Sequence, residues 1–230
     1  MFRPQKPTSD RRRSTAYEIP LSSSGESRLE KAKANNPDVN ELDLSAHELN
    51  SNNIRPIADI FSNNSHLMCV NLSGNNLGNK GVASVLKAIA NNPSTKIITL
   101  NLSDTQINSI SPNVIASFLN TNQTLQTLIL DNNSLLSVDD TLISLLSSLN
   151  SNTVTPLKIL SLQKIGLQAH HSIGKLLSSA QSHKTLEEII FDDSFDFQQI
   201  IAQTDLRCEF KPGSPVTFYM KPQLKFGYSR

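Results

Sequence analysis

The chain has 230 residues, a formal net charge of +1 and 18% charged residues. This balance excludes a strongly basic nucleic-acid binder and a protein held on membranes by charge, so we expect neither nucleic acid nor membrane as a partner. Aromatic residues make up 5% of the sequence and tryptophan is absent, which predicts a core of aliphatic side chains. Two cysteines, Cys69 and Cys208, are too few for a disulfide framework.

Residues 1–24 contain Pro, Ser and Arg throughout and show no hydrophobic periodicity, which predicts a disordered, basic and serine-rich arm. The arm has positive charge but no apolar segment of the kind that a secretory signal needs, so we expect a cytoplasmic protein. Its RRRSTAY stretch fits a basophilic kinase site at Ser14, although short matches of this kind also arise by chance. Residues 25–36 are predicted to form a helix that covers the first repeat.

A spaced pattern of apolar residues, L-x-x-L-x-L-x-x-N-x-L, begins at residues 39, 67, 97, 125 and 157 and, in degenerate form, at 186. The intervals between these starts are 28 to 32 residues. Between the copies, apolar residues recur at i, i+3, i+4 and i+7, the spacing of one helix face, as in VASVLKAI at 82–89. Each unit is therefore predicted to consist of a strand, a turn and a helix.

This pattern resembles the leucine-rich repeat. The full helix in each unit is similar to the ribonuclease-inhibitor-like subfamily, as in NOD-like receptors and tropomodulin. The resemblance implies an α/β fold, namely a right-handed, curved solenoid with parallel strands on its concave side and helices on its convex side. We assign residues 25–205 to this solenoid, including the N-terminal capping helix.

Two positional features of the repeats carry further expectations. Asparagines follow the predicted helices at 63–64, 91–92 and 150, where we expect left-handed helix C-caps. The ladder position of the family, usually Asn, Cys or Thr, has a side chain that hydrogen-bonds buried loop backbone, but His47 and Ile165 occupy it in two copies. Because Ile165 has no polar atom and follows the longest interval, we expect a local irregularity there.

From residue 206 the pattern changes to short β-like runs, LRCEF, VTFYM and LKFGY, separated by KPGSP and KPQ. We predict that residues 206–230 form a β-rich cap over the open edge of the last repeat strand. The alternative is a basic contact surface, since this segment has five Lys or Arg residues against Glu209. The final LKFGY resembles a segment near the end of the tropomodulin repeat domain.

The candidate binding site is the concave sheet, where the residues between the leucines point outward. Apolar residues among polar neighbours are typical of a partner site, although strand propensity alone also places isoleucine there. Acidic residues from 187 to 196 would suit a basic partner segment or form a solvated edge. The predicted partner-binding residues are Met68, Asn71, Ile98, Asn101, Ile129, Asp131, Lys158, Ile159, Ser161, Glu188, Ile190 and Asp192.

No group of histidines, cysteines or carboxylates has catalytic or metal-ligand spacing, so we expect no enzyme, metal or cofactor. The sequence therefore predicts a non-enzymatic, monomeric interaction module that binds a protein partner through its concave face. Two alternatives stay open. One is a bacterial effector secreted into the cytosol of a eukaryotic host cell, which the Asn- and Ser-rich composition would suit. The other is a tropomodulin-like actin regulator.

Overall fold

The computed structural model describes residues 23–108, 111–134, 156–166, 183–192, 207–209 and 215–220, together with residues 174, 177, 180 and 197. Its strands form one sheet in the order β1-β2-β3-β4-β5-β6-β8-β7. The first six are parallel neighbours that follow one another in sequence, whereas β8 is antiparallel to both β6 and β7. The strand bounds are β1 (Glu41–Asp43), β2 (Cys69–Asn71), β3 (Thr99–Asn101), β4 (Thr127–Ile129), β5 (Ile159–Ser161), β6 (Glu188–Phe191), β7 (Arg207–Glu209) and β8 (Val216–Tyr219).

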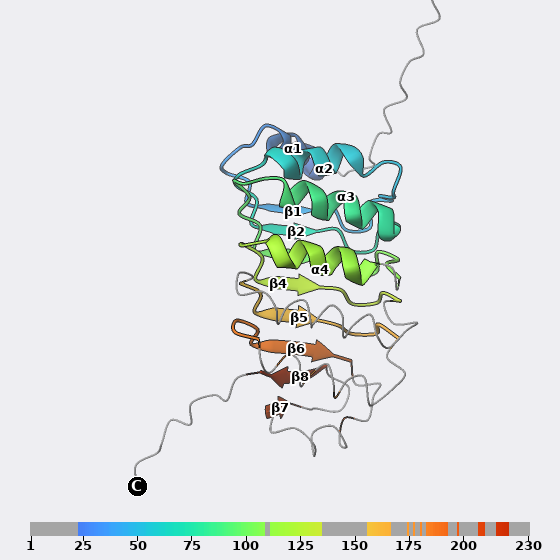
Figure 1. Cartoon of the computed structure of the whole chain (residues 1–230). Helices are drawn as coiled ribbons and strands as arrows, with labels where there is room; N and C mark the ends of the chain where they lie inside the picture. The colour runs from blue at the N-terminus through green and yellow to red at the C-terminus, as the bar shows by residue number, and fades with distance from the viewer. Residues whose placement is uncertain are drawn as a thin grey trace, which may run out of the picture.

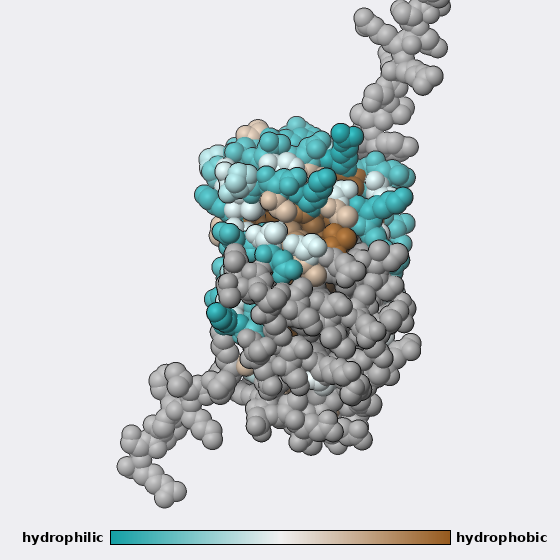
Figure 2. Space-filling view, viewed as in Figure 1, coloured by the Kyte–Doolittle hydropathy of each residue, from teal (hydrophilic) through white to brown (hydrophobic). Residues whose placement is uncertain are grey.

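Helices stack along one side of this sheet (Figure 1). They are α1 (Ser23–Lys33), α2 (Arg55–Asn63), α3 (Gly78–Ala90) and α4 (Ser111–Thr121). The helix side seen in Figure 2 is mostly hydrophilic at its upper end, where α1 and α2 lie. None of the helices in the described part of the chain is long and apolar enough to cross a membrane.

The core is a stack of aliphatic side chains supplied by equivalent positions of successive units. The second residue of each parallel strand is buried and stands in register with its neighbours: Leu42, Val70, Leu100, Leu128, Leu160 and Ile189. Because one strand and one helix cannot bury an apolar face alone, each unit is stabilised by the units on either side. The predicted phase of the strands is confirmed at these positions.

Buried loop backbone beside the strands is satisfied by Asn75, which is 2% exposed. Its Oδ1 accepts hydrogen bonds from the backbone N–H groups of His47 and Leu49, both at 3.0 Å. Its Nδ2 donates to the carbonyl oxygens of Leu44 and Leu72, both at 2.8 Å. One amide thus connects two consecutive units, and the loop that has His47 at its ladder position takes its hydrogen bonds from the next unit.

Asn133 makes the equivalent set of bonds two units further along. Its Oδ1 accepts hydrogen bonds from the backbone N–H groups of Thr105 and Ile107. Its Nδ2 donates to the carbonyl oxygens of Leu102 and Leu130. Beyond it, Ile165 is buried and offers no polar atom. In the turn before Ile165, two carboxylates accept backbone N–H groups: Asp131 accepts that of Gln163 at 2.8 Å and Asp192 accepts that of Lys164.

The irregularity expected near Ile165 does not occur in the strands. The pairing of β4 with β5 keeps the register of the preceding pairs, with Leu128 opposite Leu160. Residues 135–155, which precede β5, lie outside the described residues, as do residues 1–22 with Ser14. The β-like runs expected near 206–210 and 216–220 contain β7 and β8, which extend the sheet beyond β6.

The prediction of left-handed caps at the helix ends is wrong for α2 and α3. Asn64 has extended backbone (φ −80°, ψ 133°) and Asn91 is right-handed (φ −79°, ψ −7°). The asparagines after the helices are buried because their side chains bridge units: Nδ2 of Asn64 donates to the Ala32 carbonyl, and that of Asn92 donates to the carbonyls of Phe61 and Asn64. These asparagines stabilise stacking rather than a left-handed turn.

His183 has the same place and role before β6 that Asn64 has before β2. Oδ1 of Asn64 accepts the backbone N–H of Leu67 at 2.8 Å, and Nδ1 of His183 accepts that of Leu186 at 2.9 Å. Both side chains are buried.

We therefore expect His183→Asn to keep most of the stability of the chain, because the amide oxygen can replace Nδ1 as acceptor. His183→Ala should lower the free energy of unfolding by about 1–3 kcal/mol, since it leaves buried N–H groups without an acceptor. Urea denaturation of the two variants measures the difference. Equal losses for Asn and Ala would show that the acceptor is not what matters at this position.

Candidate protein-interaction surface

The face of the sheet turned away from the helices carries four rows of side chains, with one residue from each of β1–β6 and their flanks in every row. We call these residues the strand face. The two central rows are Glu41, Cys69, Thr99, Thr127, Ile159, Glu188 and Asp43, Asn71, Asn101, Ile129, Ser161, Ile190. The rows that precede and follow the strands are Asn40, Met68, Ile98, Gln126, Lys158, Glu187 and Ser45, Ser73, Ser103, Asp131, Gln163, Asp192.

Apolar side chains lie in the interior of this face. Met68 is 38% exposed, and the isoleucines of the strand face are partly exposed. Ile129 and Ile159 stand on the adjacent strands β4 and β5, in different rows. These apolar side chains keep part of their surface in contact with water in the folded chain. A docked partner would bury that surface, as in the apolar centre of a protein interface.

The prediction that Ser161 is exposed is wrong, because the residue is only 4% accessible. Its Oγ donates a hydrogen bond of 2.7 Å to Oδ1 of Asp131, and Nε2 of Gln163 donates to Oδ2 of the same carboxylate at 3.1 Å. The Asp131 side chain joins β4 to β5 and covers Ser161. Asp131 and Asp192, both predicted to contact a partner, therefore also stabilise the turns that follow the strands.

Asn71 and Asn101 have a similar local role. Their Oδ1 atoms accept the backbone N–H groups of Ser73 at 3.1 Å and Ser103 at 2.9 Å, which fixes the turn after each strand. Both side chains remain partly exposed on the strand face, as predicted.

Asp43 extends this row onto β1, and its carboxylate accepts the backbone N–H of Ser45 at 2.9 Å. Burial raises the pKa of Asp43, but hydrogen bonds from Ser45 and Asn71 and the charge of His47 outweigh burial, so the net shift lowers this pKa. A lowered pKa means that ionised Asp43 favours folding above about pH 4, and that this contribution is lost as the pH falls through the lowered value.

The strand face is acidic although the whole chain has a net charge of +1. Its only cation among the residues defined above is Lys158, whose Nζ lies 3.8 Å from Oε1 of Glu187. The acidic residues gather towards the two ends of the face and leave β2 and β3 neutral: Glu41, Asp43, Asp131, Glu187, Glu188 and Asp192.

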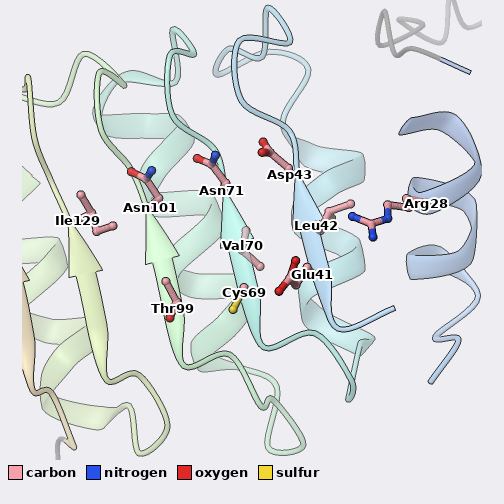
Figure 3. Close-up of a pocket in the computed structure, with 10 residues that line it drawn as sticks. All are labelled: Arg28, Glu41, Leu42, Asp43, Cys69, Val70, Asn71, Thr99, Asn101 and Ile129. Atoms are coloured by element: carbon pink, nitrogen blue, oxygen red, sulfur yellow. The ribbon is translucent and has the colours of Figure 1, made fainter. Parts of the chain in front are cut away.

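A shallow pocket of about 330 Å³ lies at the β1 end of the strand face (Figure 3). Its floor is formed by side chains of β1–β4, and Arg28 of α1 extends towards β1 at its margin. Arg28, Glu41 and Asp43 were not among the predicted site residues. The repeat copy that starts at residue 39 was the signal that could have placed the two acids on this face.

The strand face continues onto β8, which the sequence interpretation treated as part of a cap. Thr217 stands opposite Ile190 and Tyr219 opposite Glu188, so both lie in the two central rows and are partly exposed. The alternation of VTFYM could have placed them there. In the part of the chain that the structure describes, no group of three or more His, Cys, Asp or Glu residues could hold a metal ion.

Comparisons with known proteins place the fold. No protein-family model matches the chain, and no curated protein matches it in sequence. Among solved structures, it is similar to leiomodin-1 actin-binding site 2, with a TM-score of 0.57 and 17% identity over 69% of this chain and 88% of that one. It is also similar to a Caenorhabditis elegans tropomodulin C-terminal domain, with a TM-score of 0.47 and 14% identity over 79% of this chain and 89% of that one.

The first of these likenesses, together with the in-register strands, shows a leucine-rich-repeat type of α/β fold.

Proposed function

We propose that the chain is a protein-interaction module that binds a protein partner through the strand face. The observation that carries this proposal is the set of partly exposed apolar side chains, Met68 and the isoleucines of β4–β6, in the interior of a polar face with acidic ends. Such an apolar centre with a polar rim is how protein interfaces are built. The known proteins add the fold but no partner.

The same proposal includes the finer architecture. Residues 25–205 form a curved, right-handed solenoid of ribonuclease-inhibitor-like type, and residues 206–230 form its C-terminal cap. The module acts as a cytoplasmic monomer without enzymatic activity. The parallel order of β1–β6 and the antiparallel β8 beside β6 support this arrangement.

The test is affinity capture by the full chain and by variants at Ile129. Ile129→Glu and Ile129→Arg should both abolish capture of the partner and leave the melting temperature nearly unchanged. The side chain is only partly buried in the free chain, but a docked partner would trap either charge, at a cost of several kcal/mol. The two variants carry opposite charges, so a loss of capture in both reports the burial of a charge rather than a change in long-range electrostatic attraction.

Lys87→Glu is the matched control, since Lys87 is exposed on α3, on the helix side. It should leave capture intact. Loss of capture in Lys87→Glu, with retention in both Ile129 variants, would place the partner on the helices and refute the strand-face proposal.

Actin is the first partner to test, because the chain shares its fold with a structure described as leiomodin-1 actin-binding site 2. An actin regulator of this kind should slow the elongation of pyrene-labelled filaments whose barbed ends are blocked. The Ile129→Glu variant should not. No change at a large molar excess of the wild-type chain would reject actin and leave another protein as the partner.

A further inference from the structure

We propose that residues 221–230 of the chain bind back onto the β4–β6 end of its own strand face, where they compete with the partner. The inference rests on the proposed function in one respect, since both use the same surface. Unlike that function, it is tested without any partner.

The described chain leaves the sheet beside the strand face. β8 runs antiparallel to β6, and the backbone N–H of Met220 donates to the carbonyl oxygen of Glu187 at 2.8 Å. Tyr219 stands directly opposite Glu188. Met220, after which residues 221–230 follow, therefore lies next to the acidic end of the strand face.

Residues 221–230 and the β4–β6 end of the strand face have complementary side chains. Residues 221–230, KPQLKFGYSR, carry Lys221, Lys225 and Arg230 and no acidic side chain, and they also include Leu224, Phe226 and Tyr228. The surface beside their starting point offers both matching features. Its carboxylates are those of Glu187 and Glu188, and its partly exposed apolar side chains are those of Ile159 and Ile190.

Residues 221–230 are long enough to extend from β8 to β4. Neighbouring strands lie about 4.8 Å apart, so β4 is about 10 Å from β6 across the sheet. An extended segment of this length spans up to roughly 30 Å, which is more than enough to cover Ile159 and Ile129. Because the segment is covalently attached beside its site, its effective concentration there is on the order of millimolar. Weak contacts therefore suffice for occupancy.

The functional consequence is a surface that discriminates among partners. A partner must displace residues 221–230, so weakly bound proteins are excluded, and the favoured partner presents its own basic and apolar side chains. Neutralising Lys221 and Lys225 together should make capture of such a partner tighter, because the intramolecular competitor is weakened.

The experiment is zero-length carbodiimide cross-linking of the full chain at about 20 mM salt, followed by peptide mass spectrometry. We expect Lys221 or Lys225 joined to Glu187 or Glu188, with at least tenfold less product at about 0.5 M salt, where charge attraction is screened. An equal mixture of normal and ¹⁵N-labelled chains should give products within one isotopic form. The pair Lys158 and Glu187, 3.8 Å apart, is the internal positive control.

Paired variants sharpen the result. Glu188→Gln removes one acceptor on the strand face and should reduce the products of Lys225, whereas Glu48→Gln, at an exposed loop position, should not change them. Three outcomes overturn the proposal. They are formation of the Lys158–Glu187 product alone, products that join Lys6 of residues 1–22 to the strand face, and products of mixed isotopic form that reveal a second copy.

The two proposals can fail separately. If cross-links from Lys221 and Lys225 are absent but the Ile129 variants lose capture, the proposed function holds and the intramolecular contact is rejected. Tail products in a chain whose capture is unaffected by Ile129→Glu and Ile129→Arg would keep the intramolecular contact and reject the strand face as the partner site.

Discussion

Asn75→Ala should lower the free energy of unfolding by roughly 3 kcal/mol or more. The side chain is 2% exposed and bonds five backbone groups, three in the preceding unit (Leu44, His47 and Leu49) and two in its own unit (Leu72 and Ser73). Alanine leaves these groups buried without a partner, and each such group costs about 1–3 kcal/mol. Urea denaturation followed by far-UV circular dichroism measures the loss.

The adjacent Asn76 provides the control, because its side chain is exposed. Asn76→Ala should change the free energy of unfolding by less than about 0.5 kcal/mol. Asn75→Asp should cost at least as much as Asn75→Ala, because its second carboxylate oxygen would be buried against the carbonyl oxygens of Leu44 and Leu72, to which the amide donates. If Asn75→Ala and Asn76→Ala cost the same, the amide does not hold the units together.

Leu100→Ala should cost about 2–5 kcal/mol. Leu100 has no exposed surface and stands in register between Val70 and Leu128, so truncation leaves a cavity in the middle of the stack. The preceding residue, Thr99, is partly exposed on the strand face, and Thr99→Ala should cost under about 1 kcal/mol. Similar losses for the two substitutions would mean that the strands present the opposite faces to core and solvent.

The arrangement of the sheet could be predicted from the spacing of the apolar residues. Strands have a period of two, so burial of Leu100 and Leu128 fixes which neighbours lie on the strand face, and these neighbours are the residues between the leucines that were predicted to point outward. The helices α2 and α3 were predictable for the same reason, since their buried residues repeat at helical spacing.

The hydrogen bonds between repeat units could not be predicted from the sequence. The left-handed caps expected at Asn64 and Asn91 follow from a rule about one helix end, whereas Asn64 is held by the Ala32 carbonyl, 32 residues away. Ser161 was expected to be exposed because of its strand phase. It is buried because the Asp131 side chain of the neighbouring strand bonds it.

The candidate site was predicted in outline but not at its margins. The apolar positions from Met68 to Ile190 followed from the repeat motif alone. Arg28 comes from a helix outside the motif, and Tyr219 reaches the strand face only because β8 pairs antiparallel with β6. No sequence period places Arg28, and the alternation of VTFYM puts Thr217 and Tyr219 on one face without showing that their strand pairs with β6.

The most direct test of the strand face as a partner site is hydroxyl-radical footprinting of the chain alone and in its captured complex. Met68 is exposed and its thioether oxidises readily, so it reports on the strand face, while residues of α3 around Lys87 report on the helix side. We expect strong protection of Met68 and of the β4 and β5 peptides, with the α3 peptide unchanged. Protection of the α3 peptide with Met68 oxidised at its free rate would contradict the strand-face proposal.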